Sequence, residues 1–251
     1  MKKLSICIPT YNEKENIEIL INKIQEILKN ININYEIIIV DDNSPDGTGK
    51  IIDKLAEKFN NIKPVHRKKK EGLAMAYIAG FRSATGDMVI TMDADLSHDP
   101  KSILDFIKAS KYYDIVIGSR FVPGGGNFNR SRFRVIVSRL TNILATLFLK
   151  VKSSDSTSGY RLYHRRVLEN ILQYVSSQKF SFQVEILEKS KYFEFKIGQV
   201  PIQFYDRKFG KSKFNAREVG EFLAIIFEKI PILNHLRQLR RLVEFFKRLF
   251  S

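Results

Sequence analysis

Five short apolar stretches in the first half of the chain alternate with segments whose apolar residues recur at helical spacing. The stretches occupy residues 4–8, 36–40, 62–66, 88–92 and 114–118. The clearest helical pattern follows the first stretch, and its apolar positions are Ile17, Leu20, Ile21, Ile24 and Leu28. Further helices are predicted near residues 48–59, 72–84 and 100–109. This alternation predicts an α/β fold in which helices cover both faces of a mostly parallel sheet.

Composition fits a globular protein with one large domain, or one domain with an appendage. The chain has 251 residues, 44% of them hydrophobic, which is enough to bury a sizeable core. Cys7 is the single cysteine and lies in an apolar stretch, so we expect a core residue and a reducing compartment. No stretch approaches the roughly 18 apolar residues that a spanning helix needs. We therefore expect a chain that does not cross a membrane.

Carboxylates gather where the apolar stretches end. The fourth stretch leads into the sequence TMDADLSHDP, which contains Asp93 and Asp95. In an open parallel sheet, ligands bind beyond the carboxyl ends of the strands. A single aspartate there is often only a helix cap, but two in an Asp-x-Asp pattern crowd like charges that a divalent cation would relieve. The pattern therefore predicts a metal site of the kind that holds Mg²⁺ together with substrate phosphates.

Two familiar nucleotide-binding motifs are missing. No G-x-G-x-x-G sequence follows the first predicted strand. Gly210-Lys211-Ser212 lacks the upstream glycine that a phosphate-binding P-loop requires, because Tyr205 occupies that position. The sequence therefore gives no support to hydride transfer or to ATP hydrolysis.

The formal net charge of +15 is concentrated in two segments. Residues 120–166 carry +9 and residues 207–251 carry +7, so the remainder of the chain is nearly neutral. This pattern indicates a polyanionic partner: nucleic acid, anionic lipid or a phosphorylated substrate. Solvated surface charge is the alternative explanation. Nucleic acid is disfavoured because no RNP-like aromatic strand or zinc-finger spacing is present, and because an acidic strand edge repels phosphate unless a metal intervenes.

Six stretches in order resemble one known family. They are IPTYNEKENI, IIIVDDNSPDGT, GDMVITMDADLSHDP, VIGSRFVPGG, SDSTSGYRLY and FYDRKFGKSK. Together they resemble the inverting nucleotide-sugar glycosyltransferases with the GT-A (Rossmann-like) fold, and within that family the dolichol-phosphate (polyprenyl-phosphate) mannose synthases. The resemblance implies transfer of mannose from GDP-mannose to a polyprenyl phosphate.

The resemblance also implies a donor site with a divalent metal. Asp93 and Asp95 match the carboxylates that contact Mg²⁺ or Mn²⁺ and the donor, and Ser97 lies where some members place a further metal contact. Arg120 matches a cation beside the donor diphosphate. The other positions that match donor-binding residues are Pro9, Tyr11, Glu13, Val40, Asp42, Ala94, Arg207 and Lys213.

For the acceptor, the resemblance implies a polyprenyl (dolichyl) monophosphate, with Arg134 and Ser138 at its phosphate. Such a phosphate is anionic near neutral pH, so attack on the sugar needs cations rather than a strong base. A hydroxyl acceptor would require a carboxylate base. Asp155 has three open roles: this base, a positioning group or a turn former.

Alternative functions remain open alongside mannosyl transfer. Another sugar nucleotide, such as UDP-glucose, with a polyprenyl-phosphate or glycan hydroxyl acceptor is the enzymatic alternative. A nucleic-acid-binding protein is the alternative outside enzymes.

Two amphipathic segments predict peripheral attachment to a membrane. Residues 135–149 have apolar positions at helical spacing beside several arginines. From Ile232 onward, apolar residues alternate at spacings of four and three, with basic residues mostly on the other face, as in an interfacial helix. Packing against the catalytic body or a second subunit is the alternative for that helix. We expect a catalytic domain over 1–218 and a basic helical segment over 219–251, located on the cytoplasmic face directly or through an anchoring subunit.

Overall fold

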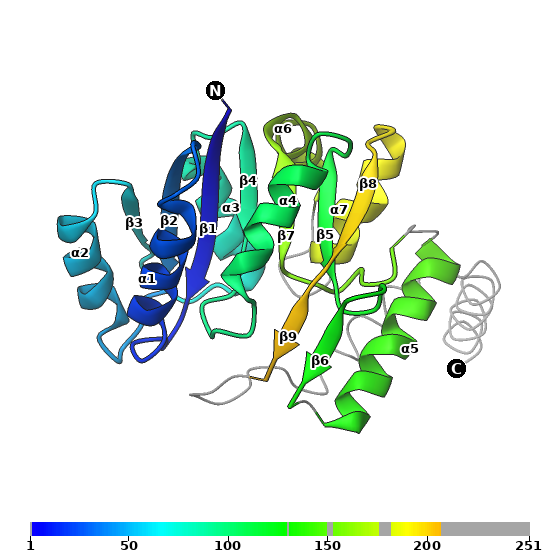
Figure 1. Ribbon diagram of the computed structural model, residues 1–251, viewed down its shortest axis with the longest axis horizontal. Coiled ribbons are helices and arrows are strands. Elements are labelled where there is room, and N and C mark those ends of the chain that lie inside the picture. The colour runs from blue at the N-terminus through cyan, green and yellow to red at the C-terminus, as the bar shows by residue number, and fades with distance from the viewer. Residues whose placement is uncertain (1, 130, 150–152, 176–181, 207–251) are drawn as a thin grey trace, which may run out of the picture.

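Alternating strands and helices form a layered α/β structure in the computed structural model, which describes residues 2–129, 131–149, 153–175 and 182–206 (Figure 1). The strands are β1 (Lys3–Thr10), β2 (Asn34–Asp41), β3 (Ile62–His66), β4 (Met88–Thr91), β5 (Ile115–Ser119), β6 (Gly126–Phe128), β7 (Arg161–His164), β8 (Ile197–Pro201) and β9 (Gln203–Tyr205). The α-helices are α1 (Ile17–Leu28), α2 (Thr48–Lys58), α3 (Leu73–Ser83), α4 (Ile103–Ala109), α5 (Arg132–Leu149), α6 (Arg165–Ile171) and α7 (Phe182–Tyr192). Short 3₁₀ turns at Pro100–Ser102 (η1) and Leu172–Tyr174 (η2) lead into α4 and follow α6.

The main sheet has seven strands in the order β3-β2-β1-β4-β7-β5-β8. All neighbouring pairs are parallel except those made by β7, which runs antiparallel to both β4 and β5. The prediction of a mostly parallel sheet is confirmed, and all five strands expected in the first half of the chain are present. The parallel register aligns the carboxyl ends of β1, β2 and β4, with Thr10 paired to Asp41 and Cys7 to Thr91.

Two apolar layers form because successive strand residues point to opposite faces of the sheet. Ile6, Ile8 and Ile39 face the layer under α1, α2 and α4. Cys7 and Ile38 face the layer under α3, α6 and α7. Strands buried on both sides explain why β1 and β2 read as continuous apolar runs. Each fully buried isoleucine of these strands contributes roughly 1.5–3 kcal/mol of burial free energy.

A smaller structural unit extends from the carboxyl edge of the sheet. β6 and β9 pair as a two-stranded parallel ribbon, and Figure 1 shows α5 beside it. The Phe128 and Tyr205 rings stack across the ribbon with centroids 5.1 Å apart. An ion pair between Arg134 of α5 and Asp206, just beyond β9, measures 3.7 Å. The helix expected at 135–149 is confirmed as α5, whereas the segment expected at 219–251 lies outside the described residues.

Candidate active site

The loops after β1 and β2 form one side of the site. Tyr11 lies beneath the ammonium group of Lys70, which is 3.8 Å from the ring centroid. Glu13 is buried, and its carboxylate accepts a hydrogen bond from the Asn16 side chain at 2.8 Å. Asp42 is buried and forms an ion pair with Arg67 from the loop after β3. Three of the residues predicted to bind the donor therefore lie in an ordered polar region.

Pro9 and Val40 lie side by side in the sheet, as a register pair of β1 and β2. The Val40 side chain is buried in the core layer that contains α3, and its carbonyl accepts a hydrogen bond from Thr10 Oγ1 at 3.2 Å. Val40 therefore contributes to the carboxyl edge of the sheet through core packing, and Pro9 is half-buried beside it.

The turn after β4 places Asp93, Ala94 and Asp95 at the same edge. The Asp93 side chain is 35% exposed, whereas Asp95 is only 6% exposed as a residue. The backbone N–H of Ser97 donates to Asp95 Oδ1 at 3.1 Å, and Leu96 adopts a left-handed φ of 63°. Ala94 is buried in the core and anchors the turn.

This turn offers ligands suited to a hard divalent cation. Within the part of the chain that the structure describes, no group of three or more His, Cys, Asp and Glu side chains is arranged so that it could hold a metal ion. Asp93 and Asp95 supply two carboxylates, and the buried Ser97 hydroxyl has no hydrogen-bond partner. Mg²⁺ characteristically takes one or two carboxylates and completes its shell with water and substrate phosphates. The residues present fit such an ion.

His98 is a buried histidine close to the charged side chains of Asp93, Asp95, Arg120 and Asp155. It is 2% exposed, and its ring stacks on Tyr160 with centroids 4.7 Å apart. Its Nδ1 accepts the Asp93 backbone N–H at 3.2 Å, and its Nε2 lies 3.9 Å from Asp93 Oδ2. Burial lowers the pKa of His98, although the nearby carboxylates of Asp93 and Asp95 oppose that shift. The imidazole is therefore neutral near pH 7, with its proton on Nε2.

Tyr77 of α3 holds Asp93 from the other side. Its hydroxyl donates to Asp93 Oδ1 at 3.2 Å. Burial, reinforced by the charge of Asp93, raises the pKa of Tyr77 well above the usual value for a phenol. The tyrosine therefore keeps its proton and remains a donor to the carboxylate.

Arg120, directly after β5, is fixed by Asp155. Its Nε and Nη2 donate to Asp155 Oδ2 and Oδ1 at 2.7 and 2.6 Å, and its backbone N–H donates to Oδ2 at 3.0 Å. Nη2 also reaches Ser138 Oγ of α5 at 3.1 Å and Thr157 Oγ1 at 3.2 Å. Asp155 is fully buried and Arg120 is 8% exposed. Of the three roles open for Asp155, the positioning role matches this geometry.

Arg134 and Ser138 lie one turn apart on α5. Arg134 forms an ion pair with Asp206, just beyond β9. Ser138 accepts a hydrogen bond from Arg120, just beyond β5, so α5 contacts the site at both positions. Arg207 and Lys213 lie outside the described residues.

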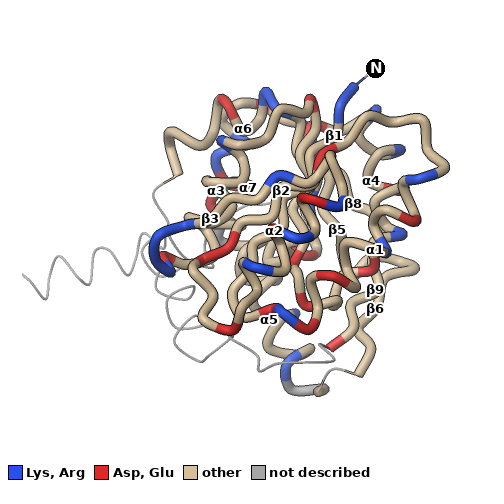
Figure 2. The backbone as a smooth tube through the Cα atoms, turned by 90° about the vertical axis from the view of Figure 1, so that its left-hand side faces the viewer, with Lys and Arg blue, Asp and Glu red and all other residues tan. Residues whose placement is uncertain are grey.

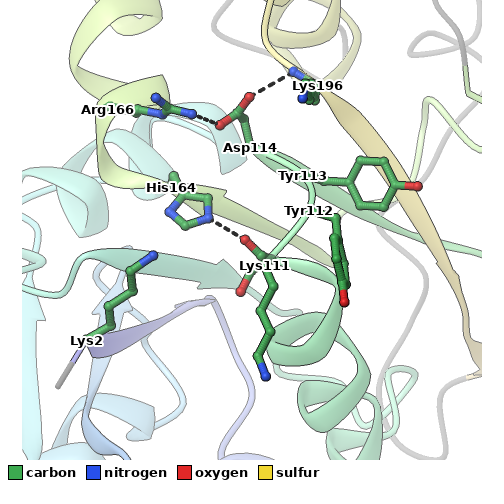
Figure 3. A pocket seen from close by; sticks show the side chains of 9 residues that line it. Lys2, Lys111, Tyr112, Tyr113, Asp114, His164, Arg166 and Lys196 are labelled. Atoms are coloured by element: carbon green, nitrogen blue, oxygen red, sulfur yellow. Dashed lines mark hydrogen bonds and ion pairs between the residues drawn. The ribbon is translucent and has the colours of Figure 1, made fainter.

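A cavity of about 520 Å³ lies at the opposite, amino edge of the sheet (Figure 3). Lys2, Lys111, Arg166 and Lys196 line it, and Asp114 forms an ion pair with Arg166 there. None of the residues predicted for the site line this cavity. It is a surface hollow between the starts of β1, β5 and β8 and the end of β7.

Sequence reasoning missed several residues of the site. Tyr77, His98 and Thr157 contact Asp93 or Arg120. His98 and Thr157 lie within two of the matched stretches but were given no role, and Tyr77 lies outside all six. The basic run that begins at Arg67 directly follows β3, and Figure 2 shows it as a continuous blue stretch beside β3. A charge run at the carboxyl end of a parallel strand is a signal that could have identified Arg67 and Lys70.

These features agree with the proteins that the chain matches. A family model described as glycosyl transferase family 2 matches residues 5–172. The chain belongs to this family and is a glycosyltransferase.

Curated relatives narrow the comparison. A dolichol-phosphate mannosyltransferase from Pyrococcus furiosus is 38% identical over 228 residues, which are 90% of this chain and 63% of the relative. The chain thus spans somewhat less than two thirds of that relative. A polyprenol monophosphomannose synthase from Mycolicibacterium smegmatis is 36% identical over 231 residues, covering 89% of this chain and 85% of the relative.

A solved structure shares the fold. Glucosyl-3-phosphoglycerate synthase from Mycobacterium tuberculosis, in complex with Mn²⁺, UDP and glucosyl-3-phosphoglycerate, superposes with a TM-score of 0.65. The match covers 92% of this chain and 80% of that chain at 18% sequence identity. This likeness identifies the GT-A-like arrangement of the sheet and helices.

Proposed function

We propose that this glycosyltransferase transfers mannose from GDP-mannose to a polyprenyl (dolichyl) monophosphate with inversion, giving polyprenyl-phosphate mannose and GDP. The single observation that carries the proposal is Arg120, held by the buried Asp155 at the edge that also presents Asp93 and Asp95. One edge thus combines a fixed cation with a pair of carboxylates. The names of the two curated relatives, a dolichol-phosphate mannosyltransferase and a polyprenol monophosphomannose synthase, support this substrate pair.

The donor occupies the loops after β1, β2 and β4 in this proposal. Tyr11, Glu13 and Asp42, on the frame of Pro9 and Val40, hold the nucleoside. Their burial and their contacts with neighbouring side chains give them fixed positions before the donor arrives. Such preorganisation reduces the entropy lost on binding.

A divalent cation, Mg²⁺ or Mn²⁺, is part of the proposal. Asp93, Asp95 and the unpartnered Ser97 hydroxyl would hold it. When bound, such an ion neutralises the charge that grows on the leaving diphosphate. The structural neighbour was solved with Mn²⁺ and UDP and, in another crystal, with Mg²⁺ and UDP, which supports a divalent ion here.

The acceptor phosphate lies between Arg120, Ser138 and Arg134 in this proposal. The Nε and Nη2 groups of Arg120 donate to Asp155, and this orients the guanidinium so that Nη2 also reaches Ser138 of α5. The acceptor is already an anion, so the proposal requires no general base, and this agrees with the engagement of both Asp155 oxygens by Arg120. Arg207 and Lys213 supply further positive charge to the two phosphates.

The lipid acceptor places the enzyme at a membrane surface, which we propose to be the cytoplasmic face. None of the described helices is both long and apolar enough to span a bilayer. Helix α5 exposes four apolar side chains at helical spacing, each more than half exposed: Ile136, Leu140, Ile143 and Leu147. This surface, the segment 219–251 or a separate anchoring subunit would provide peripheral attachment.

One experiment tests the function directly. The purified protein is offered radiolabelled GDP-mannose, UDP-glucose and other sugar nucleotides with a short polyprenyl phosphate and Mg²⁺, and the product is identified by mass and anomeric configuration. The proposal predicts β-linked polyprenyl-phosphate mannose from GDP-mannose. Efficient transfer only from another donor, or only to a glycan hydroxyl, would overturn it. Binding of arbitrary oligonucleotides without any transfer would instead favour a nucleic-acid-binding protein.

A further inference from the structure

Three polar side-chain atoms surround a small space beside Gly159. The hydroxyl oxygen of Tyr77, Oδ1 of Asp93 and Nε2 of Gln183 lie 3.4, 3.5 and 3.6 Å from the position that a Cβ atom on Gly159 would occupy. They belong to α3, the turn after β4 and the first turn of α7. Gly159 is half-buried and the Asp93 side chain is partly exposed, whereas Gln183 is buried. Glycine leaves room there for an atom of a ligand.

Buried groups hold the walls of this space in place. The fully buried Arg161 guanidinium donates to the carbonyl oxygens of Ser158 and Gln183 at 2.8 and 2.6 Å. Thr91 Oγ1, at the end of β4, donates to the Gly159 carbonyl at 2.6 Å. A buried charge that bonds to backbone carbonyls from two segments fixes their separation. The arrangement is therefore preorganised, as a specific binding site requires.

The three atoms suit a hydroxyl group. Asp93 offers a hydrogen-bond acceptor, Gln183 offers an amide donor, and the Tyr77 oxygen can accept a hydrogen bond while its proton is donated to Asp93. A hydroxyl group can donate its single proton to Asp93 and accept a hydrogen bond from the Gln183 amide. Tyr77, whose own proton is donated to Asp93, keeps that carboxylate in place. The amide hydrogens of Gln183 would repel a cation, and the Asp93 carboxylate would repel a phosphate.

Gly159 lies beside a donor-side residue in space and close to acceptor-side residues along the chain. Four residues earlier in the chain, Asp155 holds Arg120, which reaches Ser138 on the acceptor side. Asp93, on the donor side, contributes one of the three polar atoms that surround this space. A sugar passing from a diphosphate to an acceptor phosphate must lie between these two sides. The hydroxyl groups of a hexose are the polar groups available there.

We propose that Gly159 and Gln183, together with Tyr77 and Asp93, form a subsite that binds a hydroxyl group of the donor sugar and selects the sugar that is transferred. This inference rests on the proposed transfer from a sugar nucleotide. Gly159 provides the space, Gln183 donates a hydrogen bond to the sugar oxygen, and Asp93 accepts a hydrogen bond from the sugar hydroxyl. A sugar whose hydroxyl at this position has the opposite configuration is rejected because the amide and carboxylate then lose their partner.

Gly159→Ala is the first test. The backbone at Gly159 is not left-handed, and a new Cβ would make only ordinary contacts of 3.4 Å or longer, so the variant should fold. Its methyl group would occupy the hydroxyl position. We expect binding of GDP-mannose, measured calorimetrically with Mg²⁺, to weaken about tenfold, the equivalent of one good hydrogen bond. Binding of GDP, which lacks the sugar, should be unchanged and is the internal control.

Gln183→Leu is the second test, with the exposed Gln173→Leu as the matched control. Gln183→Leu should weaken GDP-mannose about tenfold and leave GDP unaffected, whereas Gln173→Leu should change neither. Singly deoxygenated GDP-mannose analogues identify the hydroxyl, because the analogue that lacks it should bind wild type and Gln183→Leu equally.

The outcomes separate the subsite from the function. Wild-type-like GDP-mannose binding by both variants would overturn the subsite, and so would an equal loss of GDP and GDP-mannose binding in Gly159→Ala. If the wild-type protein bound no sugar nucleotide at all, the proposed function would fail, and the subsite with it.

Discussion

The ion pair between Asp155 and Arg120 should stabilise the fold and the site together. Asp155→Asn removes the charge that accepts three hydrogen bonds from Arg120, at 2.6, 2.7 and 3.0 Å, and leaves a guanidinium that is 8% exposed without its counter-charge. Breaking one side of a buried pair costs about 3–5 kcal/mol. With a urea dependence near 3 kcal/mol/M, the unfolding midpoint should fall by about 1–2 M. The proposed mannosyl transfer should fall on the order of 10²-fold because Arg120 loses its orientation.

Two further variants make this prediction specific. Asp114→Asn is the matched control, because Asp114 pairs with Arg166 at the amino edge, where Arg166 is 67% exposed (Figure 3). It should cost at most about 1 kcal/mol and leave transfer unchanged. Combining Asp155→Asn with Arg120→Met should recover much of the lost stability, since no buried charge is left unpaired, but should remain inactive. An Asp155→Asn protein with the wild-type midpoint would refute the reasoning.

Three other predictions follow from the same structure. Asp95→Asn should weaken Mn²⁺ binding, measured by electron paramagnetic resonance, and reduce transfer by roughly 10²-fold, whereas full activity in excess EDTA would exclude a required metal. Burial opposes ionisation of Glu36, but hydrogen bonds from Ser5 and its neighbours outweigh it and lower the pKa from 4.5 to about 2. Glu36 therefore stabilises the fold above pH 4.5, and about 3 kcal/mol of that stability should disappear between pH 4.5 and pH 2 in wild type but not in Glu36→Gln, as urea titrations at each pH can establish. Arg207→Ala and Lys213→Ala should each slow transfer more than tenfold with unchanged unfolding midpoints, and normal kinetics for both would remove them from the site.

The first half of the fold could be predicted from the sequence because its signals are local. Each apolar run of β1 to β5 ends in polar residues, and each helix between them repeats its apolar positions at helical spacing. The buried residues of α1 are the five predicted from that spacing. The strand β7 was not predicted, because its four residues, RLYH, begin with the charged Arg161 and do not form an apolar run. Nothing local shows that this arginine will be fully buried against backbone carbonyls.

The same distinction between local patterns and long-range contacts decides which site residues could be predicted. Asp93 and Asp95 could be predicted because an Asp-x-Asp pattern at a strand end is a local signal. Asp155 could not be assigned one role, because its partner Arg120 lies 35 residues away in the chain. Tyr77 and Gln183 reach the site from α3 and α7, and only the packing of those helices on the sheet brings them there. Residues that act through long-range packing leave no pattern in a single sequence.

The geometry shows how an edge rich in aspartate can still present positive charge to the anions of the proposed reaction. Asp155 and Asp42, two buried carboxylates at this edge, each accept a guanidinium, from Arg120 and Arg67. Each pair is nearly neutral as a unit, but it fixes the direction of a cation that would otherwise sample many rotamers. The carboxylates therefore act mainly as supports for cations. In the proposed reaction, cations oriented in this way would face the phosphates of the donor and the acceptor.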